Sequence, residues 1–185
     1  MSKQQALYDN VHNVLHMLVV NDAMVLIHLA KVTLLLKSCE YFKQVIIPPL
    51  VFDETVNAGK EKGYGDAILI ESIIKTGKIK VKEVRRKDLI DRANAFNVFG
   101  GEAEAAALYW QEQADMIACD DDNVRSKKEL LEINIIGTPS IILTLFNSRK
   151  IGAEKAKQAI NNLRKIGWFS SEVLDKILME VEKNE

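Results

Sequence analysis

Residues 18–27, LVVNDAMVLI, run from a short apolar segment through Asp22 into a segment with the apolar spacing of a helix. The same change, from an apolar run through an acidic residue into a helix-like stretch, recurs in residues 116–125, MIACDDDNVR. Strands that alternate with amphipathic helices are typical of a parallel sheet covered by helices on both faces. These two stretches therefore predict an α/β fold with three layers in the order helix, sheet and helix.

Short apolar runs predict the strands of this sheet. Four of them read as buried strands and one, rich in lysine, as an edge strand over residues 78–82. The four buried strands are expected at residues 16–20, 44–48, 115–119 and 132–136. With 185 residues and 48% hydrophobic content, the chain is expected to form one domain over residues 1–185 around one core.

Helices are predicted between the strands and at both ends of the chain. Residues 1–16 are expected to form an N-terminal helical extension, and residues 151–185 two C-terminal helices, the last of them capped by Ser170 or Ser171. Pro48 and Pro49 are expected to end a strand and open a helix, because a helix tolerates proline in its first turn.

Glycines supply further breaks in the chain. Gly100 and Gly101 are expected to interrupt the chain before the alanine-rich helix, and residues 137–139, GTP, before residues 141–145.

Two more acidic residues occupy places like that of Asp22. Glu54 lies in residues 46–56, IIPPLVFDETV, and Glu102 in residues 99–108, FGGEAEAAAL. Because the strand ends of an open parallel sheet line one crevice, Asp22, Glu54, Glu102 and Asp120 can meet there and offer oxygen ligands to a hard cation. Like charges at close range are costly unless a cation or a proton lies between them.

Each of these acids also fits a purely structural role. Asp22 can be a helix N-cap, Glu54 and Glu102 can favour the positive end of a helix dipole, and residues 120–122 can cap the helix that follows them. The joint pattern favours the metal site over four separate structural roles.

The residue types narrow the chemistry of such a site. Carboxylates without paired His or Cys favour Mg²⁺ or Mn²⁺ over Zn²⁺. Beside a phosphodiester, such ions activate a water molecule and offset charge on the leaving oxygen, so phosphodiester hydrolysis is the predicted reaction. His12, His16 and His28 lack the spacing of a zinc site or a general base and are interpreted as surface or structurally hydrogen-bonded histidines.

The aromatic residues and the cysteines are expected to have structural roles. Trp110, Trp168 and Phe169 are expected to fill the core. Cys39 and Cys119 show no CxxC pairing, which predicts buried free thiols and a reducing cytoplasm. The sequence shows no signal peptide and no apolar run long enough to span a membrane, so a cytoplasmic location without a membrane partner is expected.

Charge gives no global sign of a nucleic-acid partner. The formal net charge is -1, so any RNA contact must come from local patches. Basic residues crowd two stretches, residues 75–87 and 149–165. Each can contact RNA or can be a solvated face balanced by neighbouring acids.

The motifs, taken in their order along the chain, resemble those of a known protein family. PPLVFDE at 48–54, GGEAEAAAL at 100–108, ACDDDNVR at 118–125 and IIGTPSIIL at 135–143 resemble the PIN domain family of metal-dependent ribonucleases. The chain is most similar to the branch whose pattern runs GEAEA and then DD-x-x-A-R. The resemblance covers roughly residues 17–182, including the closing segment KIGWFSSEVLDKIL at 165–178.

The resemblance implies roles for individual residues. Asp22, Glu54, Glu102 and Asp120 would form the catalytic acidic quartet. The implied metal ligands are Asp22, Glu102, Asp120 and Asp121, with Asp122 as a supplementary ligand and Arg125 either touching phosphate or pairing with the acids.

Two departures from the family pattern bear on these roles. Ala23 stands where many relatives carry Ser or Thr, and the third aspartate leaves the register of the DD pair open among Asp120, Asp121 and Asp122.

The implied function is a Mg²⁺- or Mn²⁺-dependent endoribonuclease. Compact members resemble the toxins of toxin–antitoxin pairs, which implies an RNA substrate, a small antitoxin protein and a homodimer. One alternative is a PIN-fold scaffold that binds RNA or protein without cleaving. A receiver-type domain is a second alternative, but it would need a lysine near a late strand, and Lys150 lies too far beyond the last strand.

Overall fold

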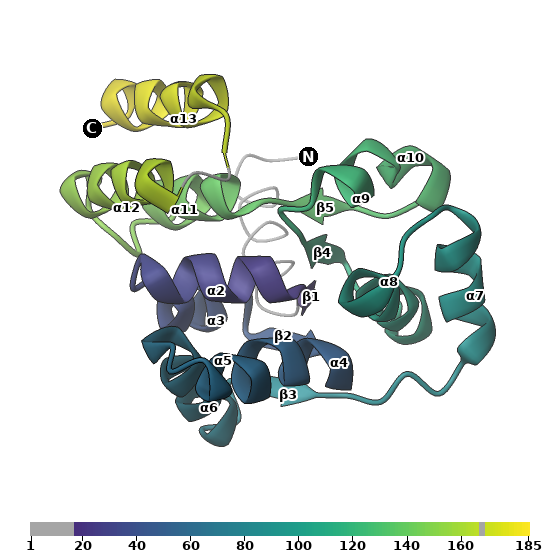
Figure 1. Ribbon diagram of the computed structural model, residues 1–185. Coiled ribbons are helices and arrows are strands. Elements are labelled where there is room, and N and C mark those ends of the chain that lie inside the picture. The colour runs from purple at the N-terminus through teal and green to yellow at the C-terminus, as the bar shows by residue number, and fades with distance from the viewer. Residues whose placement is uncertain (1–16, 167–168) are drawn as a thin grey trace, which may run out of the picture.

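The computed structural model describes residues 17–166 and 169–185, so the predicted helix over 1–16, His12, His16 and Trp168 lie outside the described residues. Five parallel strands form one sheet in the order β3-β2-β1-β4-β5 (Figure 1). The strands are β1 (Leu18–Asn21), β2 (Gln44–Ile47), β3 (Ile79–Val81), β4 (Met116–Ala118) and β5 (Ile135–Ile136).

Helices cover both faces of this sheet. On one side lie α2 (Ala23–Lys31), α3 (Leu35–Phe42), α6 (Gly65–Lys75), α11 (Thr138–Asn147), α12 (Ala153–Ile166) and α13 (Ser171–Lys183). On the other side lie α7 (Lys87–Ala95), α8 (Gly100–Glu112), α9 (Asp122–Ser126) and α10 (Lys128–Leu131). A continuous helical segment follows β2 and consists of α4 (Pro49–Phe52), the π-helical turn η1 (Asp53–Asn57) and α5 (Ala58–Glu61).

Alternation along the strands divides the interior into two apolar cores. Val19 and Val45 belong to the core under α2, α3 and α11, while Val20, Ile46 and Ile117 belong to the core under α7 and α8. Successive side chains of a strand point to opposite faces of a sheet, so a sheet that is apolar on both faces requires helices on both. The predicted three-layer α/β/α fold is confirmed.

The two edge strands of the sheet are β3 and β5. β3 lies at one edge, as expected for residues 78–82. The prediction of a buried strand over residues 132–136 is confirmed in part: a strand is present, but only Ile135 and Ile136 pair with β4, and both are half-buried at the opposite edge. An edge strand has a neighbour on one side only, which limits its burial.

The predicted breaks are also partly confirmed. Pro48 is the N-cap of α4 and Pro49 opens that helix, as expected. Gly100 and Gly101 do not interrupt the chain before the alanine-rich helix but form its first turn, with Gly100 at φ +63°. Thr138 likewise already belongs to α11.

The C-terminal helices pack into the main body. Both predicted helices are present, and Ser170 caps α13 by accepting a hydrogen bond from the Val173 amide at 3.3 Å. Leu163 of α12 and Leu174 of α13 are fully buried in the core shared with α2 and α3. The two helices therefore extend that core.

The remaining side-chain predictions concern cysteines and aromatic residues. Cys39 and Cys119 are free and buried, as expected. Trp110 and Phe169 are partly buried and packed against the two cores, and the Trp110 indole donates a hydrogen bond to the Leu131 carbonyl at 3.2 Å. No helix within residues 17–166 and 169–185 is long and apolar enough to cross a membrane.

Candidate metal and catalytic site

The central pair of strands, β1 and β4, marks the point where the order of the sheet reverses. The chain proceeds from β1 to β2 and β3 on one side, and β4 and β5 lie on the other. In open α/β sheets, such a switch point opens a crevice at the carboxyl ends of the strands. Asp22 follows β1 directly, and its amide donates a hydrogen bond to the carbonyl of Ala118, the last residue of β4, at 3.0 Å. Asp22 and Asp120 therefore lie at the crevice.

Asp22 has two different carboxylate oxygens. Oδ1 accepts a hydrogen bond from the Val25 amide at 2.8 Å, so Asp22 is the N-cap of α2. Oδ2 is buried and has no strong hydrogen-bond donor among the described residues; the Cys119 thiol beside the carboxylate is a weak donor, and the residue as a whole is 2% exposed. The structural and the functional interpretation of Asp22 are compatible, because each uses a different oxygen.

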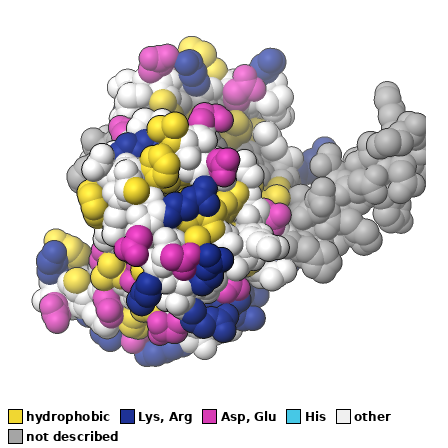
Figure 2. Space-filling view, turned by 90° about the vertical axis from the view of Figure 1, so that its right-hand side faces the viewer, with side chains coloured by type: hydrophobic (Ala, Val, Ile, Leu, Met, Phe, Trp, Pro, Cys, Tyr) yellow, Lys and Arg dark blue, Asp and Glu magenta, His cyan; other side chains and the backbone are white. Residues whose placement is uncertain are grey.

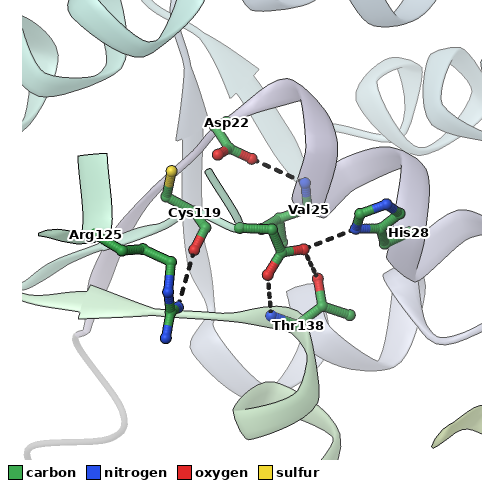
Figure 3. A network of polar contacts seen from close by, with 7 residues as sticks. Asp22, Val25, His28, Cys119, Arg125 and Thr138 are labelled. Carbon is green, nitrogen blue, oxygen red and sulfur yellow. Dashed lines mark hydrogen bonds and ion pairs between the residues drawn. The ribbon is translucent and has the colours of Figure 1, made fainter. Parts of the chain in front are cut away.

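Burial raises the pKa of Asp22 from 3.8 to about 7, the largest cause being desolvation of the charged carboxylate. The negative charges of Asp120 and Glu102 raise it further, whereas the Cys119 thiol and the Val25 amide lower it. Figure 3 shows the Asp22 carboxylate next to this thiol. Three predicted site residues thus act on one another electrostatically.

Asp120 is held by three hydrogen bonds. Its Oδ1 accepts from the Thr138 amide at 2.7 Å, and its Oδ2 accepts from the Thr138 hydroxyl at 2.5 Å and lies 2.8 Å from Nδ1 of His28. A carboxylate offers about four lone-pair sites, so roughly one remains for another partner. Asp120 therefore has a set orientation and retains capacity for a cation.

His28 and Thr138 are the site residues that the sequence did not reveal. His28 is not at the surface, since its side chain is 3% exposed, but its interpretation as a structurally hydrogen-bonded histidine is confirmed. A polar residue in the otherwise apolar helix AMVLIHLAK is the one signal that it has a buried partner. Thr138 belongs to the GTPS stretch, which by itself predicts only the start of a helix.

Glu102 and Glu54 approach the crevice from two helical segments. Glu102 lies in the first turn of α8, and Glu54 lies in η1. Burial raises the pKa of Glu54, and the charge of Glu102 raises it further, while a hydrogen bond from the Gly101 amide lowers it. Glu54 is an exposed residue and Glu102 is half-buried, so both have more freedom than Asp22 and Asp120.

Gly101 permits the close approach of Glu54. A Cβ atom at Gly101 would lie 2.6 Å from Oε2 of Glu54, closer than any ordinary contact. The glycine that the sequence marks as a break thus leaves room for the present position of the Glu54 carboxylate. Glu104, one turn further along α8, accepts a hydrogen bond from the Leu50 amide at 3.2 Å and so joins α8 to the start of α4.

The π-helical turn positions Glu54 at the rim. Single π turns within α-helices occur frequently at functional sites. The buried Thr55 hydroxyl of η1 donates a hydrogen bond to the Val51 carbonyl at 2.7 Å, so this carbonyl has a partner where the helix changes to the π turn.

The remaining acids of the DDD run have other surroundings. Asp121 is the N-cap of α9, its Oδ1 accepting from the Val124 amide at 2.9 Å, and Asp122 is exposed. The geometry therefore places Asp120, and not Asp121, beside Asp22. A ligand role for Asp121 or Asp122 stays a prediction.

The Arg125 guanidinium contacts the backbone beside the crevice. Its Nη1 donates to the Cys119 carbonyl at 3.3 Å, and a Cβ at Gly137 would lie 2.6 Å from the same nitrogen and 3.1 Å from Oδ1 of Asp120. The ion pairs within residues 17–166 and 169–185 do not include Arg125. The predicted alternative of pairing with the acids is thus not realised among these residues.

Comparison with known families decides the classification. A family model described as a PIN domain matches residues 18–183, which is nearly the whole chain. The chain belongs to the PIN domain family. PIN domains are generally nucleases, which are hydrolases, and they generally use divalent metals. No curated protein and no solved structure matches the chain.

The acids of this PIN domain fit a hard divalent cation. Among the described residues, no three His, Cys, Asp or Glu side chains form a closed group that could hold a metal ion. Such a closed group is not required, because Mg²⁺ keeps several waters and is usually bound by one or two carboxylates. The buried Oδ2 of Asp22, which has no strong hydrogen-bond donor among the described residues, and the all-oxygen donor set both suit that ion.

Some basic residues of each of the two stretches form ion pairs with acids. In the first basic stretch, Lys82 pairs with Glu112, and in the second, Arg164 pairs with Asp175. On the face drawn in Figure 2, Lys and Arg side chains are interspersed with Asp and Glu. These pairs favour the solvated-face interpretation of both stretches.

Proposed function

We propose that this PIN domain is a Mg²⁺- or Mn²⁺-dependent endoribonuclease that hydrolyses RNA phosphodiester bonds. The observation that carries the proposal is Oδ2 of Asp22, a buried carboxylate oxygen that has no strong hydrogen-bond donor within residues 17–166 and 169–185 and lies beside two further acids. Burying a charged carboxylate oxygen of this kind raises the free energy of the folded protein unless a proton or a cation binds it. A structural N-cap needs only Oδ1, and the Cys119 thiol is too weak a donor to offset the burial of a second charged oxygen.

The acids divide into a buried, hydrogen-bonded pair and a more exposed pair. Asp22 and Asp120 would hold the cation from the floor of the crevice, where the contacts to Val25, Thr138 and His28 fix their orientation. Glu54 and Glu102 would complete the ligand set from the rim. The bound ion supplies Lewis-acid activation of a water molecule and charge stabilisation on the leaving oxygen.

The proposal is tested by the metal dependence of RNA cleavage by the full chain. Mg²⁺ or Mn²⁺ should support cleavage, Ca²⁺ should bind with little turnover, Zn²⁺ should not substitute, and a chelator should stop the reaction. Glu102→Gln should abolish cleavage. Its matched control on the same helix is Glu104→Gln, which should remain active because a glutamine oxygen can still accept from the Leu50 amide. Cleavage in excess chelator, or full activity of Glu102→Gln, would refute the proposal.

We also propose that the enzyme acts as the toxin of a toxin–antitoxin pair in the cytoplasm, as a homodimer inhibited by a small antitoxin protein. Family membership supports this role in general terms only. Expression of the wild-type chain should arrest growth, and expression of Asp22→Asn should not. Growth arrest by both would contradict the toxin role, and light scattering would test the dimer.

A non-catalytic scaffold is the second candidate function. A scaffold would bind RNA in the presence of Mg²⁺ and leave it intact, so the same cleavage assay separates the two functions.

A further inference from the structure

A small cleft adjoins the acidic crevice on the side of the C-terminal helix. It has a volume of about 150 Å³ and lies between α9, the start of α11 and the start of α13. Asp120 lines both this cleft and the crevice. Its walls are formed by Asp122, Arg125, Pro139, Ser140, Phe169 and Val173.

The size of the cleft limits its ligand. Pockets for drug-sized molecules measure roughly 300–1,000 Å³, so this cleft accepts only a fragment about the size of one ring system. Phe169, Val173 and Pro139 are the apolar lining residues of the cleft. Its polar lining includes the Arg125 guanidinium, the exposed Ser140 hydroxyl and the carboxylates of Asp120 and Asp122. A flat apolar group suits the first set, and an anionic group must be held by Arg125, whose charge offsets the repulsion from the two carboxylates.

Arg125 supplies the cationic group of the cleft. A guanidinium has several N–H donors, and among the described residues Arg125 uses one of them, in the hydrogen bond to the Cys119 carbonyl. The others remain available to an anion. The guanidinium lies next to Asp120, so an anion bound there would lie beside the proposed metal site.

We infer that this cleft receives the base of one nucleotide of the RNA strand next to the bond that is cleaved, while the ribose and the phosphate of that nucleotide lie outside it. Arg125 holds a phosphate of this nucleotide, and its base lies against Phe169 and Val173. This inference rests on the proposed function and assigns a substrate subsite to it. Proteins read single-stranded RNA through splayed bases packed on aromatic and apolar side chains, so the subsite would give a base preference at one position beside the cut.

The matched variants for the test lie on α13. Val173 lines the cleft and is 45% exposed, whereas Met179 is 65% exposed and lies outside the cleft. Val173→Trp fills the cleft without disturbing the core, and Met179→Trp adds the same bulk elsewhere on the helix. Both variants should fold, which circular dichroism would verify.

Cleavage of oligonucleotides randomised at single positions gives the first readout. The wild type and Met179→Trp should share one preferred base at a position next to the cut. Val173→Trp should lose that preference and show a KM higher by about tenfold or more, with kcat at saturation little changed. An unchanged preference and KM in Val173→Trp would overturn the inference, even though metal-dependent cleavage itself would still support the nuclease.

Binding gives a second readout that does not depend on activity. Nucleoside 5′-monophosphates and inorganic phosphate are titrated into the full chain and followed by NMR shifts of α11 and α13 amides. The inference expects the nucleotides to bind more tightly than phosphate and Val173→Trp to remove that difference. Equal binding of phosphate and nucleotides, or no binding of either, would overturn it. If nucleotides bind as expected but RNA stays intact, the nuclease proposal fails and the subsite stands.

Discussion

Nδ1 of His28 lies 2.8 Å from Oδ2 of Asp120, and the two side chains are 3% and 2% exposed. The His28 ring also makes an edge-on contact with Phe169, with 5.1 Å between the ring centroids. One imidazole thus joins α2, the acid that follows β4 and the segment that leads into α13. Second partners of this kind orient metal-binding carboxylates and tune their basicity.

His28 is expected to be a positioning residue for Asp120. His28→Ala should lower Mg²⁺ affinity and cleavage by about 10- to 100-fold, because Asp120 loses its orienting partner. His28→Asn should recover much of this loss, since its amide nitrogen can occupy the place of Nδ1. Mg²⁺ affinity measured by calorimetry alongside melting temperature separates positioning from stability. Equal affinities in the two variants would show that the contact is only structural.

Asp22→Asn should change the pH dependence of stability in the metal-free protein. Between pH 3.8 and about 7, the unfolded chain has lost the Asp22 proton while the folded protein keeps it. Stability therefore falls as pH rises through this window, by an amount on the order of 4 kcal/mol at most. Asparagine cannot ionise and still accepts from the Val25 amide, so the variant should be the more stable protein above this window.

The Asp22 prediction is checked by denaturant unfolding in chelator across the same pH window. Asp91→Asn, a change of an exposed aspartate of α7, is the control and should follow the wild type. Parallel curves for Asp22→Asn and wild type would contradict the burial of a carboxylate whose Oδ2 has no strong hydrogen-bond donor among the described residues.

Asp120 should tolerate an amide better than a deletion. In Asp120→Asn, the oxygen can accept from the Thr138 amide while the NH₂ group donates to Nδ1 of a neutral His28. Asp120→Ala leaves the Thr138 amide buried without a partner and should cost roughly 1–3 kcal/mol more in unfolding free energy. Both variants should lose cleavage, which urea unfolding and RNA assays would establish. Similar stability of the two variants would argue against the hydrogen-bond network.

Gly101→Ala should separate folding from activity at Glu54. The added methyl group would lie 2.6 Å from Oε2 of Glu54, and a flexible carboxylate can move away at little cost in stability. Cleavage should fall while the melting temperature stays level or rises, because alanine favours a helix by about 1 kcal/mol over glycine. Gly65→Ala, at a helical glycine facing open space, is the control and should keep full activity. Undiminished cleavage by Gly101→Ala would remove Glu54 from the site.

The sequence by itself determined the layers of the fold and the acids at the crevice. Apolar runs of strand length set the strands because a sheet buried on both faces needs them, and Asp22 and Asp120 reach one crevice because parallel strands end at one edge. Local chemistry also determined the proline at the start of α4 and the serine cap of α13. These features depend on near neighbours in the chain, which a single sequence displays.

Only the tertiary structure decided which oxygens and partners belong to the site. Residues 28 and 120 are 92 positions apart, and no local pattern records a contact across that separation. Two backbone contacts explain why Asp120, and not Asp121, lies beside Asp22. The Val124 amide donates a hydrogen bond to Asp121, and the Thr138 amide donates one to Asp120. Gly101 was interpreted as a chain break, although it is explained by a Glu54 side chain that approaches from another helix. The burial of Asp22 and the lack of a strong donor to its Oδ2 among the described residues arise only when distant segments pack. The same packing brings Asp22, Glu102 and Asp120 close enough to raise the pKa of Asp22, because desolvation and charge repulsion depend on the surroundings and not on the residue type.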